Sequence, residues 1–176
     1  MKKYFERAEL VKNIRRSLLI ALFVFLVVLV TSFIDSALLI TSIGASAFIV
    51  FTFPAAESAK ARYLLGGYIS ASVIGVLCSA LRQAVIPAGS ERIGLVLFCV
   101  AAVLLSSLVM SVFDLEHPPS VALAISIVVS DRPVFLAVTA VISMAALFLS
   151  KLLLLKVEAR LRKAPPPKGT DDPPSN

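Results

Sequence analysis

Long apolar stretches separated by short polar turns run through most of the chain. The first stretch, residues 17–34, contains no charged residue and would reach about 27 Å as an α-helix, close to the ~30 Å hydrocarbon core of a bilayer. Asp35 separates it from a second apolar stretch, residues 36–53, which Pro54 ends. The pattern predicts membrane helices, of which the first two form a tight hairpin.

Further apolar stretches follow at residues 63–81, 93–112, 118–130 and 134–155. Together they predict an all-α, polytopic transmembrane bundle with four long spans and two shorter membrane segments, six in total. The short segments are 36–53 and 118–130. If both are re-entrant, four helices cross the membrane; otherwise six cross, and in either case both chain ends lie on one side. The halves mirror each other in layout, which suggests an inverted 3+3 repeat, a plan common among transporters.

Basic residues gather at the two ends of the chain. Of 17 Lys and Arg, six lie in residues 1–17 and six lie from Lys151 onward, so the net charge of +6 belongs to the ends. This placement predicts an integral membrane protein with both termini cytoplasmic, which we expect in a bacterial inner (plasma) membrane. Its partner is then the lipid bilayer, whereas a nucleic-acid binder would spread basic residues over one folded face.

This distribution predicts three regions. Residues 1–16 form a basic amphipathic cytoplasmic segment, residues 17–157 form the transmembrane domain, and residues 158–176, with five prolines, form a disordered tail. Lys151 and Lys156 would reach toward the headgroups from the end of the last span.

Little in the sequence indicates catalysis. The chain has one histidine, two isolated cysteines, no nucleophile elbow and no phosphate-binding loop. Asp114 and Glu116 are its only close carboxylate pair inside the apolar region. We therefore predict a protein that is not an enzyme, with no catalytic residue, no metal and no cofactor.

Polar residues meet a helix-start signal at His117. Pro118-Pro119 suits the first turn of a helix, and Ser120 would follow within that turn. Free backbone N–H groups and the positive end of the helix dipole favour an anion at such a place. If this start lies inside the membrane it predicts an anion site; at the surface it would only cap a helix.

A second polar cluster interrupts the apolar stretch 36–53. Thr41, Ser42 and Ser46 surround Gly44, which is able to break a helix, and broken helices line the cavities of many transporters. The alternative is a close-packing patch whose hydroxyls bond back to their own helix. Arg62 would either extend to the headgroups or add positive charge to an anion path. The substrate-binding candidates are Thr41, Ser42, Gly44, Ser46, Arg62, His117 and Ser120.

Small residues recur every four positions in the stretch 63–81, at Gly67, Ala71, Gly75 and Ser79. Small side chains let helix backbones approach closely in lipid, so we predict a helix-packing stripe. The stripe would serve packing inside one chain, a homo-oligomer or another membrane partner.

Several runs also match a known family. The first set is Gly44-Ala45-Ser46-Ala47, Pro54, Ala61-Arg62, Leu65-Gly66-Gly67 and Gly75. With His117-Pro118-Pro119 and Ala122-Leu123, these residues resemble the motifs of the HPP family of integral membrane proteins, over about residues 36–130. The family usually has Gly-Gly-His where this chain has Gly66-Gly67-Tyr68, and Gly-Gly where it has Ser120-Val121.

The resemblance implies a compact bundle of spans with membrane-embedded segments. Some family members are connected with nitrite transport across plastid and bacterial membranes, so nitrite is the leading substrate. Combined with the helix starts, this predicts a transporter or channel for a small inorganic anion, held by helix N-termini near Gly44 and Pro118. The alternative is a non-transporting membrane assembly or partner-binding module.

Overall fold

The computed structural model describes residues 37–163 without Ala88, and before them Ile14, Ser17, Leu18, residues 20–23, Phe25, Leu26 and Leu29. Its helices are α2 (Ala37–Thr52), the 3-10 helix η2 (Glu57–Ala59), α3 (Ala61–Val85), α4 (Glu91–Phe113), α5 (Pro119–Val129) and α6 (Pro133–Lys163). No strand occurs among the described residues, and the predicted all-α fold is confirmed.

Some of the predicted regions fall outside this part. Asp35, residues 164–176 and nearly all of the basic segment 1–16 are not among the described residues. The first span, 17–34, is described only at single positions, of which Phe23 packs on Phe51 of α2 with ring centroids 6.2 Å apart. Residues 158–163, assigned from the sequence to the tail, continue helix α6.

Three helices are long and apolar enough to cross a bilayer: α3, α4 and the first 24 residues of α6. Helix α2 has 16 residues. Helix α5 has 11 residues, which reach about 17 Å, little more than half of the ~30 Å hydrocarbon core. These two are the segments whose crossing the sequence left open. The total of six segments with four long spans, and the inverted repeat, stay predictions.

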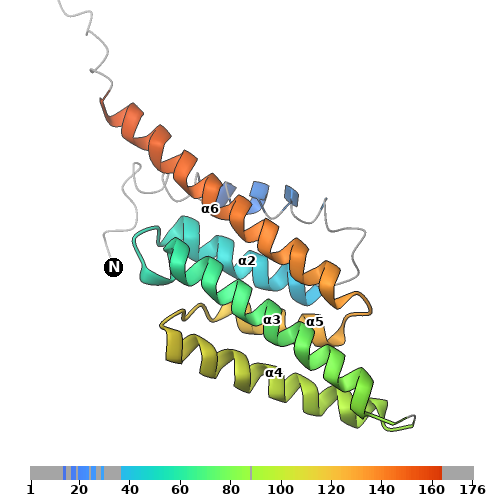
Figure 1. Cartoon of the computed structure of the whole chain (residues 1–176). Coiled ribbons are helices and arrows are strands. Elements are labelled where there is room, and N and C mark those ends of the chain that lie inside the picture. The colour runs from blue at the N-terminus through green and yellow to red at the C-terminus, as the bar shows by residue number, and fades with distance from the viewer. Residues whose placement is uncertain are drawn as a thin grey trace, which may run out of the picture.

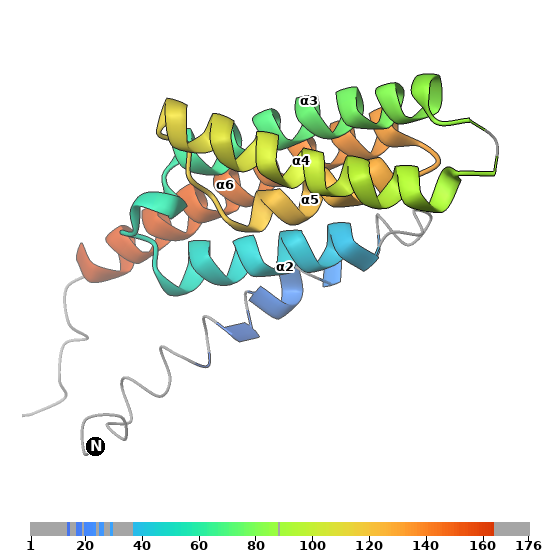
Figure 2. The ribbon, with the colours of Figure 1, turned by 90° about the horizontal axis from the view of Figure 1, so that it is seen from below.

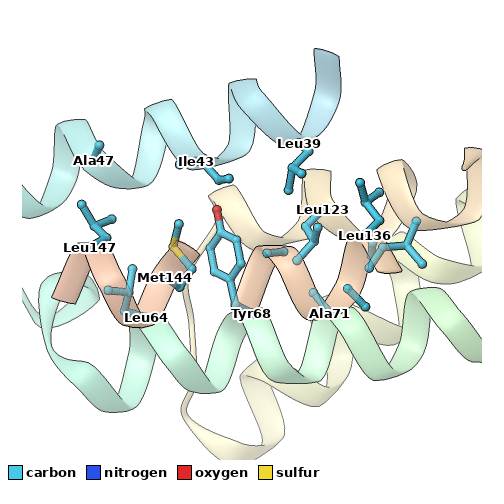
Figure 3. Close-up of a cluster of buried hydrophobic side chains, with 14 of the residues drawn as sticks. Leu39, Ile43, Ala47, Leu64, Tyr68, Ala71, Leu123, Leu136, Met144 and Leu147 are labelled. Atoms are coloured by element: carbon cyan, nitrogen blue, oxygen red, sulfur yellow. The ribbon is translucent and has the colours of Figure 1, made fainter. Parts of the chain in front are cut away.

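The short helix α5 lies at the centre of the bundle. It contacts α2, α3, α4 and α6, and Figures 1 and 2 show it enclosed by these longer helices. Leu123, Ala124, Ile127 and Val128 of α5 are fully buried. Figure 3 shows the surrounding core, where side chains of α2, α3 and α6 meet around Tyr68.

The outer surface is apolar. On α4, for example, Leu97 is 59% exposed and Leu104 is 65% exposed. Contiguous exposure of large apolar side chains is unfavourable in water but suits contact with lipid.

The predicted small-residue stripe on α3 faces the bundle interior. Gly67, Ala71, Gly75 and Ser79 are all buried. A Cβ on Gly75 would lie 2.9 Å from Ile127 Cβ and 3.1 Å from Ala124 O, so only glycine allows α3 and α5 to approach this closely. The stripe therefore packs helices inside one chain.

We expect Gly75→Ala to lower the free energy of unfolding by about 1–3 kcal/mol, because its new Cβ meets Ile127 and the α5 backbone rather than a flexible side-chain end. Gly66→Ala on the same helix is the matched control. There the Cβ meets only Leu115 side-chain atoms, and the alanine gains up to about 1 kcal/mol of helix propensity. Thermal unfolding in detergent micelles, followed by circular dichroism, compares the two; equal midpoints would contradict the close approach.

Candidate functional site

The loop between α4 and α5 turns back into the bundle. Helix α4 ends at Asp114, which has φ 52° and ψ 57° in the left-handed region. From α3, Arg62 Nη2 donates to Phe113 O at 2.9 Å, and Tyr63 Oη donates to Asp114 Oδ2 at 3.2 Å. These contacts fix where the loop leaves the surface.

Farther along α3, Gly67 has no side chain and so makes room for the loop between α4 and α5. A Cβ on Gly67 would lie 2.8 Å from His117 Cβ and 3.0 Å from Ser120 Oγ. Gly67 follows Ala61, the first residue of α3, by six positions, about 9 Å along the helix. His117 and Ser120 therefore lie inside the bundle with no exposed surface, whereas Pro118 between them is exposed.

His117 is hydrogen-bonded through both ring nitrogens. Its Nδ1 lies 3.0 Å from Ser58 O, and its Nε2 lies 2.8 Å from Ser46 Oγ. A carbonyl oxygen only accepts, so Nδ1 carries a hydrogen and donates it to Ser58. In the neutral imidazole, Nε2 is then the acceptor for the Ser46 hydroxyl.

Three hydroxyl groups complete this cluster. Tyr68 Oη lies 2.6 Å from Ser42 Oγ and 2.9 Å from Ser46 Oγ, and Ser42 Oγ donates to Pro119 O at 2.6 Å. The Tyr68 side chain is fully buried, and Figure 3 shows its oxygen directed from α3 toward α2. We call Ser42, Ser46, Tyr68 and His117 the polar cluster. It joins α2, α3 and the start of α5.

The start of α5 offers no free donors for an anion in this structure. Pro118 and Pro119 have no N–H. Ser120 N donates to His117 O at 2.9 Å, and Val121 N donates to Pro118 O at 3.1 Å. The hydroxyl of Ser120 also donates to His117 O, at 2.6 Å. The first two N–H groups after Pro119 therefore bond within the first turn, and an anion held by the backbone there stays a prediction.

The expected break at Gly44 is wrong. Helix α2 runs without interruption from Ala37 to Thr52, so no helix starts near Gly44 and its backbone donors stay in the helix. A glycine inside a helix costs only about 1 kcal/mol, which the packing of α2 against α5 and α6 outweighs.

The remaining predicted site residues separate into two groups. Ser42, Ser46, His117 and Ser120 come together in the bundle interior. Thr41 is exposed, and its Oγ1 donates back to Ala37 O at 2.8 Å, as the packing alternative predicted. Arg62 is exposed and lies 3.5 Å from Asp114 Oδ2, away from the polar cluster.

Two residues of the site were missed in the sequence. Tyr68 stands where the HPP family usually has histidine, and that departure was the available signal. Lys151 was expected at the end of its span, but α6 continues to Lys163 and Lys151 lies within it. Lys151 is 6% exposed, and its Nζ donates to Ala59 O at 2.7 Å. The consecutive carbonyls of Ser58 and Ala59 therefore hold His117 and Lys151.

No carboxylate whose burial the structure describes shares this interior. The acidic side chains that the structure describes, Glu57, Glu91, Asp114, Glu116 and Asp131, are all exposed. The buried ammonium group of Lys151 thus has a carbonyl, not a carboxylate, beside it.

Apolar outer faces around an enclosed polar cluster define an integral membrane protein of the polytopic helical class. The family model described as HPP, transmembrane region matches residues 6–164. The chain therefore belongs to the HPP transmembrane family, as the resemblance indicated. Comparison with curated proteins and with solved structures finds no match.

His117 is the single histidine of the chain, so its tautomer is directly measurable. We expect the hydrogen on Nδ1 at neutral pH, because Ser58 O accepts from that nitrogen. A two-bond ¹H–¹⁵N correlation spectrum of histidine-labelled protein in micelles distinguishes the tautomers. A hydrogen on Nε2 alone would contradict the contact with Ser58.

Removing the Tyr68 hydroxyl should destabilise the cluster. In Tyr68→Phe, Ser42 and Ser46 lose a buried partner, which we expect to lower the free energy of unfolding by about 1–2 kcal/mol. Tyr63→Phe on the same helix is the control. It removes only a 3.2 Å bond to an exposed carboxylate and should change stability by less than about 0.5 kcal/mol. Unfolding midpoints in micelles compare the two, and equal loss in both would mean that the buried hydroxyl adds nothing.

Proposed function

We propose that this protein is a transporter that moves a small inorganic anion, with nitrite as the leading candidate, across the membrane. The observation that carries the proposal is Lys151. Among the described residues, it is the one Lys, Arg, Asp or Glu that is buried. Ionisable side chains in the interior of membrane bundles are expensive, and they commonly mark ion or substrate paths.

The sign of this charge selects the substrate class. An ammonium group has three hydrogens to donate, and Ala59 O accepts one of them. Because the described carboxylates are all exposed, an anion is the ligand that would balance the buried charge. The remaining two hydrogens would bind its oxygens.

The polar cluster supplies the second part of the site. Ser58 and Ala59 are consecutive, so an anion at Lys151 lies close to the bonds that His117 makes with Ser58 and Ser46. Side-chain donors thus replace the helix N-termini in this proposal. The connection of HPP members with nitrite makes nitrite the first anion to test.

The alternative function, a partner-binding or assembly module, rested on the stripe of small residues. That stripe contacts α5 inside the chain, through Gly67 and Gly75, and therefore gives no separate support for a partner. We place transport first for this reason.

In proteoliposomes, we expect Lys151→Met to lower nitrite flux at least about tenfold, equivalent to ~1.4 kcal/mol, because it removes the buried charge and keeps the side-chain length. Lys156→Met, an exposed lysine on the same helix, is the matched control and should leave flux unchanged. Lys151→Arg retains the charge and should retain preference for anions over cations. Unfolding midpoints confirm that each variant folds. Full flux in a folded Lys151→Met would overturn the proposal.

A further inference from the structure

The polar cluster has more donor–acceptor contacts than hydrogens to fill them. Six contacts connect its four side chains with one another and with the carbonyls of Ser42, Ser58 and Pro119. Each hydroxyl and the neutral imidazole supply one hydrogen apiece. Two contacts are therefore left without a hydrogen when His117 is neutral.

Most of these hydrogens have fixed places. Ser42 donates to the carbonyl of Pro119, which can only accept. Tyr68 must then donate across its 2.6 Å contact with Ser42, and His117 donates from Nδ1 to Ser58. The hydroxyl hydrogen of Ser46 is the one that remains.

Ser46 Oγ has three acceptors within reach. They are Ser42 O at 3.1 Å, Tyr68 Oη at 2.9 Å and His117 Nε2 at 2.8 Å. In the neutral state the hydrogen of Ser46 points to His117 Nε2. If a proton binds Nε2, that N–H donates to Ser46 Oγ instead, and the Ser46 hydrogen turns to Tyr68 or to the Ser42 carbonyl. One hydroxyl rotation therefore accommodates the extra proton, and one more contact gains a hydrogen.

From this geometry we propose that His117 takes up one proton with each anion, so that transport is proton-coupled. The inference rests on the proposed function. The proton comes from water on the side of uptake, binds the Nε2 lone pair, and leaves to water on the other side with the anion. One proton and one monovalent anion move together, so the cycle transfers no net charge.

The groups around His117 explain why the two ligands would bind together. Ser46 faces the ring from α2, Tyr68 from α3, Ser58 O from η2, and Lys151 of α6 occupies the adjacent carbonyl of Ala59. Ser120 follows within α5 and contacts Met110 of α4. Tyr68 and Lys151 are the titratable groups of this set. Because His117 and Lys151 bond to adjacent carbonyls, an anion bound at Lys151 would lie near the ring and favour its positive form. Anion and proton therefore promote each other's binding, and this coupling is reciprocal.

The test uses the full chain in proteoliposomes with nitrite outside and a fluorescent pH indicator inside. A pH gradient, acid outside, is compared with a potassium–valinomycin potential. We expect the gradient to drive nitrite uptake with one proton per nitrite, and the potential to have no effect. Empty liposomes give the background from nitrous acid that crosses the lipid unaided, and Lys156→Met serves as the protein control.

His117→Gln retains an amide that can donate to Ser58 and accept from Ser46, but it cannot hold a proton. We expect gradient-driven accumulation of nitrite to be at least about tenfold lower with this variant than with the unmodified protein. Voltage-driven nitrite flux without proton movement in the unmodified protein would overturn the proton inference and leave anion transport in place. Flux equal to that of empty liposomes would overturn the proposed function itself.

A second readout does not require the His117→Gln variant to fold. Nitrite should increase the imidazolium fraction of His117 at a fixed pH, seen in the ¹⁵N spectrum of the histidine-labelled protein. Lys151→Met should remove this effect of nitrite. A His117 signal that nitrite leaves unchanged in the unmodified protein would overturn the coupling.

Discussion

A helix that ends inside a bilayer must satisfy its polar start within the protein, because lipid offers no hydrogen bonds. Helix α5 has 11 residues, and the same requirement applies at its start, where His117 and Ser120 have no exposed surface. The first turn meets part of the requirement itself: its prolines remove two donors, and His117 O accepts from Ser120. The His117 ring needs partners from other elements, and Ser42 of α2 donates in addition to Pro119 O. The elements packed around α5 supply these partners.

Each neighbouring element meets this requirement with a particular kind of residue. Helix α3 gives space, since glycine at 67 and 75 lets its backbone approach α5. Helix α2 gives hydroxyls, with Ser42 and Ser46 one turn apart on its buried face. The 3-10 helix η2 gives the carbonyls at its C-terminal end, which have no partner within a helix. The hydrogen-bonded polar cluster therefore lies where α5 starts, among buried side chains that are mostly apolar.

Apolar stretches and the stripe of small residues were enough to predict an all-α membrane bundle, and turn signals located the start of α5. Ser42, Ser46, His117 and Ser120 were among the seven candidates because hydroxyls and histidine are unusual inside such stretches, and the structure brings these four together. Gly44 led to a wrong prediction of a helix break, because a glycine shows only that a helix is able to break at that position. Lys151 was missed because its partner is the backbone of Ala59, 92 residues away. Every residue has a backbone carbonyl, so the sequence does not show which carbonyl accepts a hydrogen bond from a distant side chain.

The arrangement at η2 also connects the two charges on which transport would depend. In the proposed function Lys151 carries the positive charge, whereas His117 can be neutral or positive, and both bond to one three-residue helix. Any movement of η2 shifts both partners together, because Ser58 and Ala59 are adjacent in the chain. In the proposed cycle, this shared support is the physical connection between the two sites. On the proposed mechanism, an anion bound at Lys151 would change the proton affinity of His117, and this link would need no large motion of the helices.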